Sequence, residues 1–301
     1  MIHVNSAFDT RSVFRDMPLA LLAKRHGIPL LLKVHGSPSE LVSPTRNVVE
    51  LAKRILIRNI SILCVLSAAE KAEFEYFLPE VSGRVYVVKN VISDTFLKAK
   101  RCESDDPVIL FASRFLEGKG PFHLLEAASS IVERIPSARF VFLGDGPAGP
   151  AFDAEIRHRR VSSFVQRIPS VGRSEIASWY TRCWVFVFPT LFPEGMPMVI
   201  AEAMATGTPI VTTRTRFSLS YMSESENCLY CESRNPKSIA DQVVTVLTDS
   251  AMRRRMSTAN RRLALRFRGD IVAKEFLLLY EKLVSASPRA STAAAVSSVV
   301  V

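Results

Sequence analysis

The chain has 301 residues, of which 48% are hydrophobic and 23% charged, which is ordinary for a folded protein of two domains and excludes a disordered or fibrous one. Its formal net charge of +10 favours anionic partners, but charge alone does not choose among nucleotide phosphates, a membrane surface and nucleic acid. No apolar run reaches the ~20 residues that a membrane-spanning helix requires.

The five cysteines are scattered, which predicts reduced thiols and therefore a cytoplasmic protein. If this protein contacts a membrane, we expect it to lie peripherally on the inner face. Cys228 and Cys231 form a CxxC motif. A zinc site would need a second such pair or nearby histidines, so we predict no metal there.

In the first hundred residues, short apolar runs alternate with segments of helical spacing. The predicted strands are Met1 to Val4, Leu30 to Val34, Ile60 to Leu66 and Val85 to Val88. The predicted helices are Arg15 to Arg25, Val48 to Arg58 and a segment ending at Phe77. This alternation predicts a parallel α/β layer. Because no strand with a glycine-rich turn precedes His3, we expect this layer to be incomplete at its N-terminus.

The charged segment Lys98 to Pro107 is the predicted linker, which divides the chain into a first domain, 1–104, and a second, 105–284. The second series has strands at Val108 to Ala112, Arg139 to Leu143, Val165 to Ile168, Trp184 to Phe188, Ile210 to Thr213 and Cys228 to Cys231. Its helices are Pro121 to Glu133, Ala151 to Arg159, Glu175 to Thr181, Met198 to Ala205 and Pro236 to Thr248, followed by two basic helical segments. Residues 285–301 are predicted to be a disordered tail.

The stretch Glu194 to Val211, EGMPMVIAEAMATGTPIV, joins two of these strands through a helix. Pro197 fits the first helical position and Gly207 fits a C-terminal cap. The first turn of such a helix presents unpaired N–H groups, here those of Met198, Val199 and Ile200, to an anion.

Two carboxylates bracket this helix start. Glu194 precedes it, and the side chain of Glu202 inclines back toward it. A buried Glu202 would need a hydroxyl or a cation as partner, and a sugar hydroxyl would serve. The alternative is that Glu194 complements the helix dipole and Glu202 lies in solvent.

Two cations, Arg114 and Lys119, follow the strand Val108 to Ala112 and are therefore expected at the same sheet edge. Together with the helix start they would bind a diphosphate without a metal. The Gly118-Lys119-Gly120 string lacks the spacing and hydroxyl residue of a P-loop, so an ATPase is not favoured. The alternative is a pair of solvated surface cations.

Two other loops follow predicted strands. Gly144 to Gly149 matches GxGxxG, but the strand after it lacks the acidic residue of a dinucleotide site, so we predict a tight turn lining the same cleft. His35 follows the strand Leu30 to Val34 and is placed for ligand contact, with a surface histidine as the alternative.

These motifs resemble family 4 retaining glycosyltransferases of the GT-B architecture, and the resemblance extends from Ile2 to Val284. It rests on the two glutamates separated by seven residues, on Ser-Arg followed by Gly-Lys-Gly at 113–120, on FVFLGDGP at 140–147 and on ENCLY at 226–230. The resemblance implies an α/β protein in which two Rossmann-like domains face a cleft, with the nucleotide sugar held mainly by the second domain.

The resemblance also implies residue roles. Glu202 would hold the ribose, Glu194 the donor sugar, and Arg114 and Lys119 the diphosphate, with His35 near the transferred sugar. The diphosphate would also be contacted by the backbone of residues 195 to 199, which are Gly195, Met196, Pro197, Met198 and Val199. The backbone of Val171 would contact the base, and Gly144 would line the cleft. The donor would be a UDP or GDP sugar, no cofactor or metal would be needed, and configuration at the sugar would be retained.

The predicted function is therefore transfer of a sugar from a nucleoside diphosphate to a saccharide or lipid-linked acceptor. The first alternative is a truncated, non-catalytic sugar-nucleotide-binding remnant. The second, a nucleic-acid-binding protein, rests on charge alone and lacks interleaved aromatic residues. A run of arginines lies on predicted helices near the C-terminus: Arg253 to Arg255, Arg261, Arg262, Arg266 and Arg268. We expect it to form either a solvated face or a surface for anionic lipid.

Overall fold

The computed structural model describes residues 1–35 and 48–285, and in it the chain divides into two compact units. The first unit contains residues 1–90 and the C-terminal segment from Asp270, and the second contains Val91–Gly269. Both are α/β units built on parallel sheets, as the alternating pattern predicts. Of the predicted tail, only Ser285 lies within the described residues, and it ends a helix.

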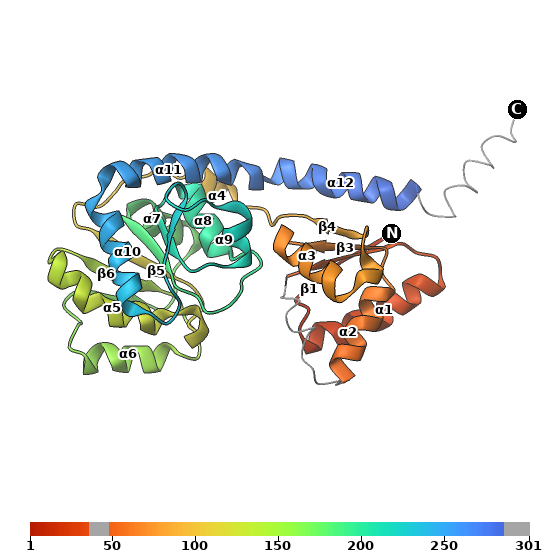
Figure 1. Ribbon diagram of the computed structural model, residues 1–301, viewed down its shortest axis with the longest axis horizontal. Helices are drawn as coiled ribbons and strands as arrows, with labels where there is room; N and C mark the ends of the chain where they lie inside the picture. Colours follow the sequence, from red (N-terminus) through yellow and green to blue (C-terminus); the bar gives the residue numbers. More distant parts are fainter. Residues whose placement is uncertain (36–47, 286–301) are drawn as a thin grey trace, which may run out of the picture. The chain divides into compact units, whose positions relative to one another are not determined.

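The first unit has a four-stranded parallel sheet in the order β1-β2-β3-β4. Its strands are β1 (Ile2–Ser6), β2 (Leu30–Val34), β3 (Ile62–Val65) and β4 (Val85–Val87). Its helices are α1 (Thr10–Arg25), α2 (Val48–Arg58), α3 (Ala68–Phe77) and α12 (Gly269–Ser285). Figure 1 shows α1 and α2 on one face of this sheet and α12 on the other.

Strand β2 supplies both cores of this unit, because successive side chains point to opposite faces. Leu30, Leu32 and Val34 pack in the cluster with α1 and α2, whereas Leu31 packs with α12. Lys33, the polar residue of this strand, is buried and donates a hydrogen bond to the carbonyl of Lys89 at 2.9 Å. Burial lowers the pKa of Lys33 to about 8.

The second unit has a six-stranded parallel sheet in the order β10-β9-β8-β5-β6-β7. Its strands are β5 (Val108–Ala112), β6 (Arg139–Leu143), β7 (Val165–Ile168), β8 (Val185–Phe188), β9 (Ile210–Thr212) and β10 (Cys228–Tyr230). The chain runs outward through β6 and β7, returns to β8 beside β5, and then runs the other way. In open sheets of this kind, ligands bind at the carboxyl ends of the strands where the order reverses, here between β5 and β8.

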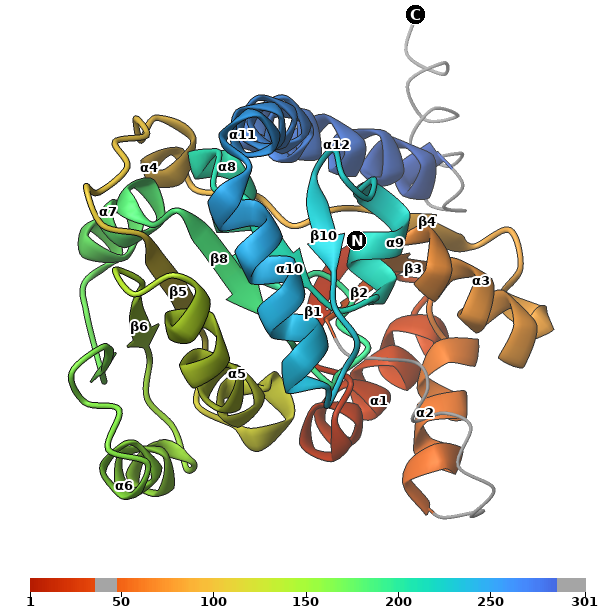
Figure 2. The same ribbon diagram turned by 60° about the vertical axis from the view of Figure 1, so that its left-hand side comes forward.

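Helices cover both faces of this sheet. They are α4 (Asp94–Leu97), α5 (Pro121–Arg134), α6 (Gly149–His158), α7 (Arg173–Arg182), α8 (Met198–Thr206), α9 (Arg216–Tyr221), α10 (Pro236–Thr248) and α11 (Ser250–Ala264). Figure 2 shows α5 and α10 side by side in front of the strands. Phenylalanines fill the core; the rings of Phe111 and Phe142 lie 5.6 Å apart, and those of Phe142 and Phe152 lie 4.7 Å apart.

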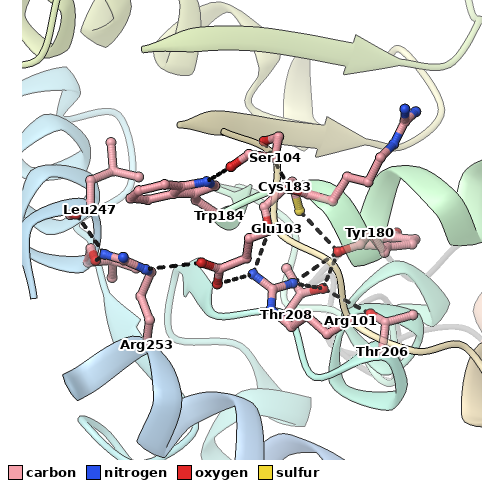
Figure 3. A network of polar contacts seen from close by, with 12 residues as sticks. Arg101, Glu103, Ser104, Tyr180, Cys183, Trp184, Thr206, Thr208, Leu247 and Arg253 are labelled. Atoms are coloured by element: carbon pink, nitrogen blue, oxygen red, sulfur yellow. Dashed lines mark hydrogen bonds and ion pairs between the residues drawn. The ribbon is translucent and has the colours of Figure 1, made fainter. Parts of the chain in front are cut away.

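The expected boundary between residues 104 and 105 is wrong by this division, since the second unit already begins at Val91. One of the charges that made Lys98 to Pro107 look like a solvated linker, that of Arg101, binds the backbone of this unit instead. Arg101 donates to the carbonyl of Cys183 at 2.6 Å and to that of Tyr180 at 3.2 Å (Figure 3). Just before this segment, within the second unit, Phe96 is buried.

The arginine run is likewise not uniformly solvated. Arg253 is buried and donates to the carbonyls of Val246 and Leu247 at 2.9 and 2.6 Å, where α10 ends (Figure 3). Its guanidinium lies 4.2 Å from the centre of the Trp184 ring. Arg261 donates to the carbonyl of Thr206, at the end of α8. These two arginines satisfy helix C-termini that would otherwise be unpaired.

Replacing Arg253 with alanine is expected to lower the free energy of unfolding by about 3 kcal/mol, because two charge-assisted hydrogen bonds and the stacking on Trp184 are lost. The matched control is Arg254→Ala, since Arg254 is the next residue and is exposed. Urea denaturation of both variants measures the difference. Equal stability of the two variants would contradict the structural role of Arg253.

Candidate functional site

Helix α8 forms one wall of the site. It runs from Met198 to Thr206, and Gly207 closes it in the left-handed conformation with φ of 73°, which confirms the predicted cap. Pro197 is the N-cap residue and not the first helical residue, because its ψ of 117° is extended. The helix therefore begins at Met198, as the predicted range has it, and only the placement of Pro197 at the first helical position is wrong.

The first turn of α8 is free to bind an anion. No side chain caps the helix, and within residues 1–35 and 48–285 the N–H groups of Gly195, Met198 and Val199 have no protein acceptor. Met196 and Pro197 are buried, and Pro197 has no N–H to offer an anion. The carbonyl of Pro197 accepts from the N–H of Ile200 at 3.1 Å, so the prediction that the Ile200 N–H is unpaired is wrong. Unpaired N–H groups at a helix start attract negative charge.

A cavity of about 330 Å³ opens at this helix start, along the carboxyl ends of β5, β6 and β7. Five predicted residues line it: Arg114, Gly144, Val171, Val199 and Glu202. The structure thus brings together residues that span 89 positions of the sequence, at the point where the strand order reverses. Its volume lies in the range of small-molecule sites.

Arg114 and Glu202 differ in how they are held. Arg114 is exposed, and its guanidinium has no partner within the described part of the chain. Glu202 is half-buried and accepts a hydrogen bond from the Tyr180 hydroxyl at 3.4 Å. Burial, followed by the charge of Glu202, raises the pKa of Tyr180 well above its usual range, so this hydroxyl remains a donor.

Sequence reasoning missed Tyr180. It lies on α7, and its position beside Glu202 depends on the packing of α7 against α8. A fully buried tyrosine needs a partner for its hydroxyl, but the sequence does not reveal that partner. The alternative that Glu202 simply lies in solvent is wrong, because its carboxylate lines a cavity and accepts from a buried hydroxyl.

Lys119 and Glu194 form an ion pair, with Nζ 2.6 Å from Oε1. Their side chains are only 20% and 12% exposed, so this pair is not a solvated surface contact. The Thr190 hydroxyl donates to the same Oε1 at 2.9 Å. Lys119 Nζ also lies 5.6 and 5.2 Å from the centres of the Phe188 and Phe192 rings. Lys119 and Glu194 were predicted to act on separate parts of a donor, and here they contact each other.

The loop that carries Glu194 packs closely on the loop that carries Lys119. The N–H of Leu191 donates to the carbonyl of Gly118 at 2.7 Å. A Cβ on Gly118 would overlap the Phe192 ring, and one on Gly120 would overlap the carbonyl oxygen of Pro189. Both glycines therefore permit the approach of the two loops. Glu194 itself has an unusual φ of 38°, a conformation that costs energy for a residue with a side chain.

The GxGxxG segment forms a tight turn, as predicted. Gly144 has φ of 137°, and a Cβ there would overlap the carbonyl oxygen of Ser113. Gly146 has φ of 156°, and a Cβ there would overlap the carbonyl oxygen of Phe115. These glycines hold the turn against the end of β5, where Gly144 lines the cavity.

His35 belongs to the first unit, so the cavity of the second unit is built without it. Its N–H donates to the carbonyl of Ser6 at 2.9 Å, and its Nε2 lies 3.1 Å from Oδ1 of Asn5. The ring is thus oriented by β1, and its role at a transferred sugar stays a prediction.

The fold and this cavity define a parallel-sheet α/β protein with a ligand-sized cavity at the carboxyl ends of its strands, and comparison with known proteins identifies its family. The model of the family "Glycosyl transferases group 1" matches residues 93–263, more than half of the chain. The chain belongs to this family.

Among characterised relatives, Spore coat protein SA of Bacillus subtilis is 31% identical over 183 residues, 58% of this chain and 48% of that protein. D-inositol 3-phosphate glycosyltransferase of Corynebacterium urealyticum is 26% identical over 250 residues, 76% of this chain and 58% of that protein. N,N'-diacetylbacillosaminyl-diphospho-undecaprenol alpha-1,3-N-acetylgalactosaminyltransferase of Campylobacter jejuni is 26% identical over 179 residues, 59% of this chain and 45% of that enzyme. The chain spans about half the length of these relatives.

Solved structures agree on the fold, which is that of GT-B glycosyltransferases. Anabaena HepE, solved with UDP and glucose, superposes with a TM-score of 0.77 at 18% identity, over 93% of this chain and 78% of that chain. Sucrose-phosphate synthase of Thermosynechococcus elongatus superposes with a TM-score of 0.77 at 19% identity, over 95% of this chain and 74% of that one.

Proposed function

We propose that this chain transfers a sugar from a nucleoside-diphosphate sugar to a saccharide or lipid-linked acceptor. One observation carries the proposal: a single cavity joins Glu202, Val199 with its unpaired N–H at the start of α8, and Arg114 with its unpartnered guanidinium. A carboxylate suits vicinal ribose hydroxyls, while the helix start and the arginine suit phosphate oxygens.

The chemistry would depend on charge. When the nucleoside diphosphate leaves, the sugar becomes oxocarbenium-like and the diphosphate gains negative charge. Cationic groups that are already in place stabilise that charge at little reorganisation cost. Arg114 and Lys119 would fill this role without a metal, and Glu194 would hold hydroxyls of the donor sugar. Resemblance to family 4 enzymes supports transfer with retention of configuration.

The names of the relatives support the two kinds of acceptor. One relative is named for an inositol phosphate acceptor and another for a diphospho-undecaprenol acceptor. No helix among the described residues is long and apolar enough to cross a membrane. A cytoplasmic enzyme that contacts anionic lipid through Arg254, Arg255, Arg262 and Arg266, all exposed, is our proposal for a lipid-linked acceptor. Co-sedimentation with anionic vesicles tests it.

Nucleotide binding is the direct test of the proposed function. We expect UDP or GDP to raise the melting temperature, and the better ligand identifies the base. Glu202→Ala should weaken the affinity for that nucleotide about 10- to 100-fold, because a charge-assisted hydrogen bond to the ribose is lost. The control is Glu133→Ala, which removes an exposed carboxylate from α5. Failure of both nucleotides to bind would contradict the proposal.

A further inference from the structure

The second unit has another cavity, of about 720 Å³, at the carboxyl ends of β8, β9 and β10. It shares no lining residue with the cavity that contains Glu202. Its wall includes Thr190 and Phe192 from the loop after β8, Arg214 after β9, Tyr230 and Glu232 around the end of β10, and Gln242 of α10. Such a volume would admit a ligand larger than a single sugar ring.

The charges around this cavity are balanced. Arg214 is paired with Glu224 at 2.9 Å, and its guanidinium carbon lies over the Tyr230 ring, 4.3 Å from the ring centre. Glu232 accepts a hydrogen bond from the Asn235 amide at 2.7 Å. The lining itself therefore contributes one cation and one anion, and neither sign dominates. This balance disfavours a phosphate or another strongly anionic ligand.

Groups that suit hydroxyls remain available in the wall. The Gln242 amide, half-exposed on α10, has no partner within the described part of the chain and can both donate and accept. The Phe192 ring is 42% exposed and offers an apolar surface against which the C–H face of a sugar ring can pack. A carboxylate, an amide and the exposed Phe192 ring together favour a neutral, hydroxyl-rich ligand.

This cavity adjoins the ion pair of Lys119 and Glu194. Thr190 belongs to its wall, and the hydroxyl of that residue donates to Glu194. The Phe192 ring contacts Lys119 on the ion-pair side and also lines the cavity. A saccharide bound here would therefore lie next to the residues that the proposed function assigns to the donor sugar.

We propose that this second cavity is a subsite for a neutral saccharide, occupied by the sugar units of an acceptor. Saccharide binding follows from the lining alone, whereas its assignment to the acceptor rests on the proposed function.

Saturation-transfer NMR with maltose, lactose and chitobiose tests the subsite on the full chain. We expect a saturation-transfer signal from at least one of these disaccharides. Neither saturating UDP nor inorganic phosphate should change the size of that signal. Gln242→Ala should weaken the affinity about tenfold, because a hydrogen-bonding amide is lost. The matched control, Gln166→Ala, removes an exposed glutamine of β7 that lines neither cavity and should leave binding unchanged.

Several results would overturn the subsite. They are the absence of a saturation-transfer signal with all three disaccharides, displacement of the bound disaccharide by UDP or phosphate, and equal disaccharide affinities of the Gln242 and Gln166 variants. Failure of the proposed function is a different result, since UDP and GDP would then not bind while disaccharide binding persists. Glu202→Ala separates the two cavities further, because it should weaken nucleotide binding and leave disaccharide binding intact.

Discussion

Lys119→Ala is expected to lower kcat/KM for the nucleotide-sugar donor about 100- to 1,000-fold. The mutation removes a cation at the proposed diphosphate position and leaves Glu194, which is 12% exposed, with the Thr190 hydroxyl as its partner. Both nucleotide affinity and turnover should therefore fall. Isothermal titration with the nucleotide and a donor-turnover assay measure the two effects separately.

Glu194→Ala should behave differently, because this carboxylate is assigned to the donor sugar and not to the diphosphate. Nucleotide affinity should be retained while transfer falls. In the double variant, the loss of transition-state stabilisation should be smaller than the sum of the two single losses, since residues in direct contact are coupled.

The control for Lys119→Ala is Lys98→Ala. The side chain of Lys98 is 78% exposed and is paired with Asp94 of a short helix. Unchanged turnover in Lys119→Ala would contradict the assigned role.

Gly120→Ala is expected to lower the free energy of unfolding by about 2 to 4 kcal/mol. Gly120 has φ of 83°, which is unfavourable for alanine, and the added Cβ would overlap the carbonyl oxygen of Pro189. The two loops would have to separate, so the contact between Lys119 and Glu194 should weaken as well. Thermal and urea unfolding measure the loss of stability, and nucleotide binding reports on the site.

The control for this variant is Gly172→Ala. Gly172 has an ordinary φ of −68°, and a Cβ there would meet no atom within 4 Å. Its stability should remain within about 0.5 kcal/mol of the parent. If the Gly120 and Gly172 variants unfold at the same denaturant concentration, the close approach of the two loops does not constrain the fold.

Much of the second unit could be predicted because its signals are local. Short apolar runs followed by helical periodicity identify β5 to β8 and α8, and Gly207 ends α8 as its position indicates. Parallel strands place their carboxyl ends at one sheet edge, so Arg114 and Gly144 could be assigned to one site from the sequence, and the family resemblance added Val171.

Errors arose where a charged residue binds the backbone of a segment distant in sequence. Arg101 and Arg253 look solvated by composition, yet they bind carbonyls at Cys183 and at the end of α10. The Arg101 contact ties the predicted linker to the second unit, which begins at Val91 and not at residue 105. The Arg253 contact means that this arginine is not part of an exposed basic face. Whether a cation is exposed depends on the carbonyls that the fold brings to it.

The sequence by itself determined the succession of strands and helices, the end of α8 and the residues at the edge of the second sheet, because periodicity and caps act over a few residues. Tertiary structure alone decided that Lys119 pairs with Glu194, that Tyr180 donates to Glu202 and that Thr190, in the wall of the second cavity, donates to Glu194. The first two contacts join residues that are 75 and 22 positions apart in the sequence, and the third lies within the loop after β8. Their geometry depends on how α7 packs on α8 and on how the loops that carry Lys119 and Glu194 pack together.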